Sequence, residues 1–259
     1  MALSSGSDFV NFICPLKERL SVYDPSRRPY DQPRNDAAGP TRSIPHGFID
    51  AMEVRAQVFV DEQKMPLEKE MDEDDQRSFH WVAYASVSDK GGRKASGSRG
   101  AEDEKAKAHR RTSTSTKVPI GTIRVVPPRH GPHPNDVQRT AMHDGVESYV
   151  KFSRLAVVPE FRKTGISSLL FSTALAFVRE RPDELMPSQN PLEMLRQQAD
   201  RGANLGFKGL CHVHSPKGAQ KVWKKYGFEV DPEMGTWQEE GIEHVGMWMR
   251  IDVSRGRRK

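Results

Sequence analysis

A basic turn between a predicted strand and a predicted helix carries the clearest chemistry in this sequence. Residues 152–158 read as a buried strand, Pro159 ends it, and an amphipathic helix opens at Gly165. The turn between them places Arg162 and Lys163 beside the unpaired backbone N–H groups of a helix N-terminus. Such an end binds anions, and a glycine there lets a phosphate approach the backbone closely. The pattern therefore predicts a ligand that carries a pyrophosphate group.

An acidic run, Glu68 to Asp75, is the second segment with chemical potential, because it holds six carboxylates in eight residues. If these groups converge in space, crowding would raise the pKa of a carboxyl group and let it accept a proton near neutral pH. The run would then form an acidic wall that attracts a cationic amine. Two other interpretations stay open: a solvated acidic loop, or ion-pair partners for Arg124 and Arg154, which lie in predicted buried strands.

Four histidines lie in or beside predicted strands: His80, His212, His214 and His244. Each fits a structural role more readily than a catalytic one. His212 and His214 should share one face of their strand, since side chains alternate along it, and His214 should lie beside the predicted cleft. The four lack a further ligand at a suitable spacing, so no metal site is expected.

The composition of the chain sets its class. It has 259 residues, with 36% hydrophobic and 29% charged, which fits one large domain with some unpacked segments. We expect no membrane span and no secretory signal, and two cysteines are too few for a disulfide framework. These features favour a cytoplasmic protein, with a nuclear location as the alternative. Nucleic-acid binding is not expected, because no aromatic residues interleave with the basic clusters.

The predicted elements follow the order of one α/β domain with a mixed sheet. They comprise a helix at 47–59, strands at 80–86, 120–126 and 152–158, a helix at 165–180, a strand at 209–214, a helix at 217–226, and strands at 228–230 and 245–251. This domain is expected to span 44–252, between an irregular N-terminal arm at 1–43 and a basic tail at 253–259.

Three insertions are predicted within the domain. Residues 88–117 contain no large apolar side chain, so they cannot bury enough surface to offset their ordering entropy and should be disordered. Residues 127–147 are rich in proline and glycine and should form loops. The third insertion, 182–204, should include a short helix at 191–200.

The basic turn resembles the acyl-coenzyme A loop of the Gcn5-related N-acetyltransferases (GNAT family), with its pattern Gln/Arg-x-x-Gly-x-Gly/Ala. Arg162, Gly165 and Ser167 stand at its three positions, and only Ser167 departs from the usual residue. The later helix resembles another GNAT pattern through Ala219, Gly227 and Phe228. It has Trp223 where the family often has the tyrosine that protonates the leaving thiolate, and whether Tyr226, three residues along, can replace it stays open.

Two longer patterns resemble the ElaA-type subfamily, and with the turn they span about residues 47–251. They are Arg55-x-x-x-Phe59-Val60-x-Glu62-Gln63 with Glu70-x-Asp72-x-x-Asp75 and His80, and Trp237-x-x-Glu240-Gly241-Ile242-x-His244-x-x-Met247. The resemblance implies the GNAT fold, in which helices flank a central mixed, mostly antiparallel sheet. It also implies transfer of an acetyl group from acetyl-CoA to a primary amine by direct attack, without an acyl-enzyme.

The resemblance also assigns roles to residues of this chain. A carboxylate of Glu70, Asp72 or Asp75 would remove the amine proton. The acceptor would be a small amine, and the acidic run favours a cationic one. The cofactor site would use backbone N–H groups of Ala156, Val157 and Val158 for the thioester and pantetheine, and Arg162, Lys163, Thr164, Gly165, Ile166 and Ser167 for the pyrophosphate.

Two alternative functions remain. A catalytically idle GNAT module that only binds coenzyme A would fit the missing tyrosine at Trp223. An acyltransferase of the acyl-homoserine-lactone-synthase type would fit the Arg55 and Glu70 patterns, but those synthases carry a glutamate where this chain has Lys151. The sequence defines neither the acceptor nor the oligomeric state.

Overall fold

The structure is a computed structural model that describes residues 9–32, 43–88, 115–186 and 207–253. Three sequence predictions fall mainly on other residues and lie outside this description. They are the disordered insertion at about 88–117, the insertion at 182–204 with its helix at 191–200, and the basic tail at 253–259.

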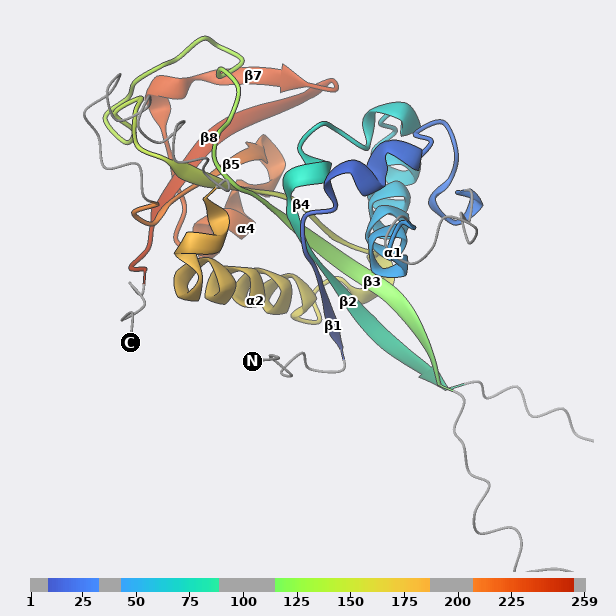
Figure 1. The fold of residues 1–259 in the computed structure, drawn as a ribbon. Coiled ribbons are helices and arrows are strands. Elements are labelled where there is room, and N and C mark those ends of the chain that lie inside the picture. Colours follow the sequence, from blue (N-terminus) through green and yellow to red (C-terminus); the bar gives the residue numbers. More distant parts are fainter. Residues whose placement is uncertain (1–8, 33–42, 89–114, 187–206, 254–259) are drawn as a thin grey trace, which may run out of the picture.

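The described strands form one eight-stranded sheet in the order β1-β2-β3-β4-β5-β8-β6, with β7 paired to β8 (Figure 1). The parallel neighbours are β4 and β5, and the other paired strands run antiparallel. The bounds are β1 Val10–Ile13, β2 Phe79–Ser88, β3 Ser115–Val126, β4 Tyr149–Val157, β5 Leu210–Pro216, β6 Glu229–Val230, β7 Thr236–Glu239 and β8 Ile242–Arg250. The predicted mixed, mostly antiparallel sheet is confirmed.

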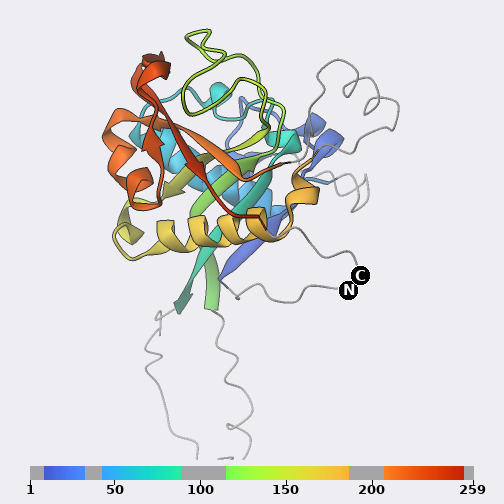
Figure 2. The same cartoon turned by 90° about the vertical axis from the view of Figure 1, so that its left-hand side faces the viewer.

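Helices cover both faces of this sheet. Helix α2 (Ile166–Glu180) lies along one face (Figure 2), and α1 (His46–Arg55) packs on the other. Neighbouring residues of β2 show the two sides, because Trp81 packs against Phe177 of α2 and His80 packs against Phe48 of α1, with ring centroids 5.5 Å and 5.2 Å apart. Alternation of side chains along a strand thus gives each helix its own apolar face.

Helix α2 confirms the helix predicted at 165–180. Its buried residues, Leu170, Phe171, Ala174 and Val178, recur at three- and four-residue intervals and form one apolar stripe against the sheet. Helix α1 continues as a π-helical segment, Ala56–Glu62, which brings Phe59 to the edge of the cleft described below. The helix predicted at 217–226 is a 3₁₀ turn, Lys217–Ala219, followed by α4 (Gln220–Lys225).

The prediction of an irregular arm at 1–43 is wrong for part of that segment. Strand β1 pairs with the edge of β2, Ile13 is buried, and the Phe12 ring lies 5.0 Å from that of Trp81. Two other strands also differ from expectation: β7 was not predicted, and β3 begins at Ser115, inside the predicted insertion. Residues 127–148 contain neither helix nor strand, as expected.

Candidate functional site

The two parallel strands at the centre of the sheet diverge and open a cleft. Strands β4 and β5 pair only from Tyr149 to Lys151, opposite residues 210–212. On its other side β4 carries a bulge, because Arg124 of β3 pairs with Ser153 whereas Thr122 pairs with Ala156. Two residues of β4 therefore oppose one residue of β3, which bends the strand away from β5. Arg154 lies in this bulge with a φ of 52°, in the left-handed region.

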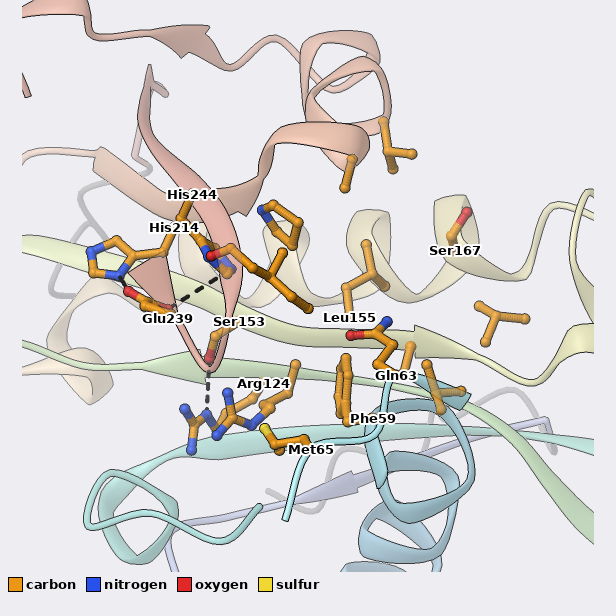
Figure 3. Close-up of a pocket in the computed structure, with 18 of the residues that line it drawn as sticks. Phe59, Gln63, Met65, Arg124, Ser153, Leu155, Ser167, His214, Glu239 and His244 are labelled. Atoms are coloured by element: carbon orange, nitrogen blue, oxygen red, sulfur yellow. Dashed lines mark hydrogen bonds and ion pairs between the residues drawn. The ribbon is translucent and has the colours of Figure 1, made fainter. Parts of the chain in front are cut away.

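A cleft of about 990 Å³ follows this divergence (Figure 3). One end, here called the turn end, is lined by Arg162, Lys163, Ile166 and Ser167. The other, here called the histidine end, is lined by Asp72, Arg124, Lys151, Ser153, His214, Glu239 and His244. Between them lie the apolar side chains of Phe59, Met65, Leu155 and Trp223. The cleft thus joins a basic end and a polar end through an apolar middle.

The turn end is an open helix N-terminus. Gly165 precedes α2 with a φ of 92°, a conformation that glycine adopts without strain, and no side chain caps this end. A Cβ at Gly165 would meet no atom within 4 Å, so the helix N–H groups are approachable there. Arg162 is held over the turn by a 3.0 Å bond from Nε to the carbonyl of Val157 and by an ion pair with Glu62.

The predicted residues of the turn divide into two groups. Arg162, Lys163, Ile166 and Ser167 line the cleft, whereas Thr164 and Gly165 do not. The Thr164 hydroxyl donates to the carbonyl of Phe161 at 2.6 Å, which stabilises the turn from within. These two residues therefore shape the turn, and the other four face the cleft.

The three predicted backbone donors at the end of β4 and just after it, Ala156, Val157 and Val158, do not all face the cleft. The N–H of Val158 donates to the carbonyl of Ile120 at 3.0 Å, so the expectation that it binds a ligand is wrong. Ala156 lies two residues earlier, in register with Thr122, and its N–H points the same way. Only Val157 lies between them with its N–H directed toward the diverging β5, and this residue also lines the cleft.

Three carboxylates of the acidic run form ion pairs with buried arginines. Glu70 and Asp75 are fully buried, as is Arg55 of α1, which forms ion pairs with both. Arg124 donates to both carboxylate oxygens of Asp72 at 2.6 and 2.8 Å and lies 2.9 Å from Asp75. The alternative in which the run supplies partners for buried arginines is the one that the structure shows.

These ion pairs reverse the expected pKa shift for Asp72 and Asp75. Burial by itself would raise the pKa of Asp75, but the guanidinium groups of Arg55 and Arg124 hold it well below its usual range. The pKa of Asp72 is lowered in the same way by Arg124 and Arg154, against burial. For these two carboxylates the expected rise in pKa is therefore wrong. Of the three predicted bases, only Asp72 lines the cleft.

The histidine end contains a hydrogen-bonded pair that the acidic-run prediction did not include. His214 Nδ1 lies 2.6 Å from Glu239 Oε1, and the indole N–H of Trp237 donates to the same oxygen at 2.7 Å. His244 Nε2 lies 3.9 Å from the other oxygen (Figure 3). Because a carboxylate only accepts, Nδ1 of His214 carries the proton and Nε2 keeps a free lone pair.

Burial lowers the pKa of His214, and the bond to Glu239 offsets only part of this effect. The imidazole is therefore neutral at pH 7 and able to accept a proton. His214 had been singled out in the sequence, whereas Glu239 had not. Its signal is the alternation Trp237-x-Glu239, which places both side chains on one face of β7, and that strand was not predicted.

Neither residue considered as a proton donor for a leaving thiolate has the required geometry. Trp223 lines the cleft, but an indole is not a general acid near neutral pH. Tyr226 does not line the cleft itself, and its hydroxyl donates to Ser167 Oγ at 3.2 Å and lies 3.4 Å from Ser168 Oγ. Tyr226 therefore anchors the start of α2.

Two further observations concern the described residues only. Within these ranges no three His, Cys, Asp or Glu side chains gather in a way that could hold a metal ion. None of the helices in the same part of the chain has the length and apolar composition that a membrane crossing requires.

Comparisons with known proteins give similar structures. No family model matches the sequence, and no curated protein matches it. The chain is similar to a Lactobacillus plantarum protein described as an N-acetyltransferase, with 17% identity, a TM-score of 0.43, and coverage of 80% of this chain and 92% of that one. For Escherichia coli ElaA the identity is 14% and the TM-score 0.40, over 78% and 89% of the two chains. For a CoA-dependent acyl-homoserine lactone synthase the identity is 14% and the TM-score 0.44, over 93% of this chain and 83% of that one.

Proposed function

We propose that this protein is a CoA-dependent acyltransferase of the GNAT family, which transfers an acetyl group from acetyl-CoA to a primary amine. One observation carries the proposal: a single cleft runs along the divergence of β4 and β5 from an open helix N-terminus to a histidine–glutamate pair. A ligand with a pyrophosphate at one end and a reactive thioester at the other matches this order of basic, apolar and polar surfaces.

The turn end would hold the pyrophosphate. Arg162, Lys163 and the first N–H groups of α2 supply positive charge and donors, and Ser167 adds a hydroxyl. Arg162 would exchange its pairing with Glu62 for a phosphate oxygen. That exchange costs little, because both side chains of the pair are about 40% exposed and such pairs contribute about 0–1 kcal/mol.

The N–H of Val157 would bind the thioester carbonyl as charge develops on its oxygen. A neutral amine would attack the carbonyl carbon directly, so that the C–N bond forms and the C–S bond breaks with release of the CoA thiolate. Direct transfer is supported by the cysteines, since Cys211 is buried and neither it nor Cys14 lines the cleft. Among the residues that face the cleft, His214 is suited to take the proton of the amine.

Isothermal titration of acetyl-CoA into the wild type and an Arg162→Glu, Gly165→Asp variant tests the donor site. We expect micromolar binding by the wild type and none by the variant. The control is Arg179→Glu, an exposed charge reversal near the other end of α2. Glu62→Gln should have the opposite effect on acetyl-CoA binding. It releases Arg162 from its ion pair and should tighten binding by about two- to fivefold. Loss of binding in the control, or no binding by the wild type, would contradict the proposed site.

Release of free CoA thiol in the presence of primary amines then tests catalysis. Turnover with at least one amine is the expected result. Tight acetyl-CoA binding without turnover of any amine would instead favour the catalytically idle module.

A further inference from the structure

The charges at the histidine end of the cleft are almost completely paired. Three arginines and three carboxylates form a closed cluster, in which each arginine contacts two of the acids: Arg55 with Glu70 and Asp75, Arg124 with Asp72 and Asp75, and Arg154 with Glu70 and Asp72. Lys69 and Glu240, at the rim, pair at 3.0 Å. Among the described residues at this end, one cation and one anion remain without an oppositely charged lysine, arginine or carboxylate partner, Lys151 and Glu239.

Lys151 is the unpaired cation. It lies at the last residue pair before β4 and β5 diverge, opposite His212, and its half-buried side chain lines the cleft. In the described part of the chain its ammonium group forms neither an ion pair nor a hydrogen bond. Burial consequently lowers the pKa of Lys151. An ammonium group that is partly shielded from water and has gained no partner is poised to bind an anion.

Glu239 is the remaining anion. Within the described ranges its carboxylate contacts His214, His244 and Trp237, but no lysine or arginine lies within ion-pair distance. Its side chain is 37% exposed and lines the same end of the cleft as Lys151, with which it forms no ion pair. The two opposite charges thus border one space without neutralising each other.

We propose that this end of the cleft binds an acceptor that carries both a primary amine and a carboxylate, as a free α-amino acid does. Lys151 pairs with the carboxylate, and the His214–Glu239 pair receives the amino group and takes its proton. The proposal rests on the proposed acetyltransferase function. It replaces the cationic acceptor expected from the sequence, because the arginines neutralise the acidic wall on which that expectation depended.

The proton and bond changes balance on these groups. The acceptor arrives as an ammonium group, and His214 Nε2 takes one proton to form the neutral amine, while Glu239 stabilises the resulting imidazolium. The amine nitrogen attacks the thioester carbon, and collapse of the tetrahedral intermediate breaks the C–S bond. The nitrogen then loses its second proton, which neutralises the departing CoA thiolate. The products are the N-acetylated acid, CoA and one proton, which His214 returns to water.

Matched acceptor pairs test the role of Lys151. Each pair consists of an amino acid and its carboxamide, which keeps the amine and the side chain but removes the negative charge. For the best pair we expect the wild type to favour the acid by about 10- to 100-fold in kcat/KM, the range of one charge-assisted pair. Lys151→Met should remove this preference by lowering kcat/KM for the acid alone. The control Lys225→Met, on the exposed face of α4, should keep it.

Titration with acetyl-CoA separates the possible failures. If Lys151→Met binds acetyl-CoA like the wild type but loses activity equally on acids and amides, Lys151 acts in another role and the proposal is wrong. Equal use of both members of every pair, or acetylation of neither by a protein that binds acetyl-CoA, would also overturn it. Absence of acetyl-CoA binding by the wild type would instead overturn the proposed function, and the acceptor site with it.

Discussion

At the level of single residues, the protonation of His214 depends on Glu239. The bond from Nδ1 to that carboxylate raises the pKa of His214, against the larger lowering by burial. Other charged or titratable groups face the ring from neighbouring elements: Lys151 of β4, His244 of β8, His212 of β5 and His133 of the loop before β4. Glu239 is the acidic group with which the ring shares a hydrogen bond, so removing its charge should change the pKa of His214 more than a change at the other groups would.

We therefore predict that Glu239→Gln shifts the acidic limb of the kcat profile to lower pH. The neutral amide no longer favours the imidazolium, so the pKa of His214 falls further and the ring stays unprotonated in more acid solution. The same change should lower kcat on its plateau by about 10- to 100-fold, because the ring loses its orientation and its counter-charge. Initial rates between pH 5 and 8 give both quantities. A limb that stays in place or moves to higher pH would contradict the assignment of His214.

At the level of elements, the arginine–carboxylate cluster joins four segments of the fold. Arg55 comes from α1, Arg124 from β3 and Arg154 from the bulge of β4, and all three contact the loop that holds Glu70 and Asp75. The acidic run thus links helix α1 to the sheet through buried ion pairs. It builds one wall of the cleft without supplying its base.

Arg55→Leu should consequently destabilise the protein by about 3–5 kcal/mol, because it removes the cation that two fully buried carboxylates share and leaves Glu70 with Arg154 alone and Asp75 with Arg124 alone. Urea unfolding at pH 7.5 measures this loss. The control is Arg28→Leu, since Arg28 pairs with Asp61 and both side chains are more than 40% exposed. That change should cost no more than about 1 kcal/mol. Similar small losses of unfolding free energy in both variants would show that the cluster does not hold the helix and the sheet together.

The elements with long, regular patterns could be predicted from the sequence. Helix α2 has an apolar stripe over 15 residues, and β2, β3, β4, β5 and β8 each contain several buried apolar residues. Strands β1 and β7 have four residues each and exist through backbone pairing with a neighbour, which leaves no such pattern. The same limit applies to the site. The turn at Arg162 is contiguous and was found, whereas Glu239 joins His214 only across the sheet.

At the level of the whole molecule, several buried histidines couple folding to pH. Burial lowers the pKa of His80 to about 4 and that of His130 to about 3, and it lowers that of His212 well below its usual range. Each is neutral in the folded protein near pH 5.5, but it binds a proton once unfolded, below about pH 6.5. Their contribution to stability is therefore complete above pH 6.5 and declines as the pH falls. The depressed carboxylates Asp72 and Asp75 lose theirs only below about pH 4.

These three histidines should therefore make the free energy of unfolding fall between pH 6.5 and 4.5, and together they contribute up to about 4 kcal/mol per pH unit, about 1.4 for each. His212 offers a clean test, because its ring stacks on Trp248 at 4.0 Å and neither nitrogen has a partner in the described structure. His212→Phe should reduce the slope by about 1.4 kcal/mol per pH unit, whatever its effect on stability at pH 7.5. Urea titrations at unit pH intervals measure the slopes, and His46→Gln, at an exposed site, reports the effect of removing a histidine as such. Parallel curves for His212→Phe and the wild type would mean that His212 takes up no proton on unfolding, and the acid sensitivity of the fold would then have to arise elsewhere.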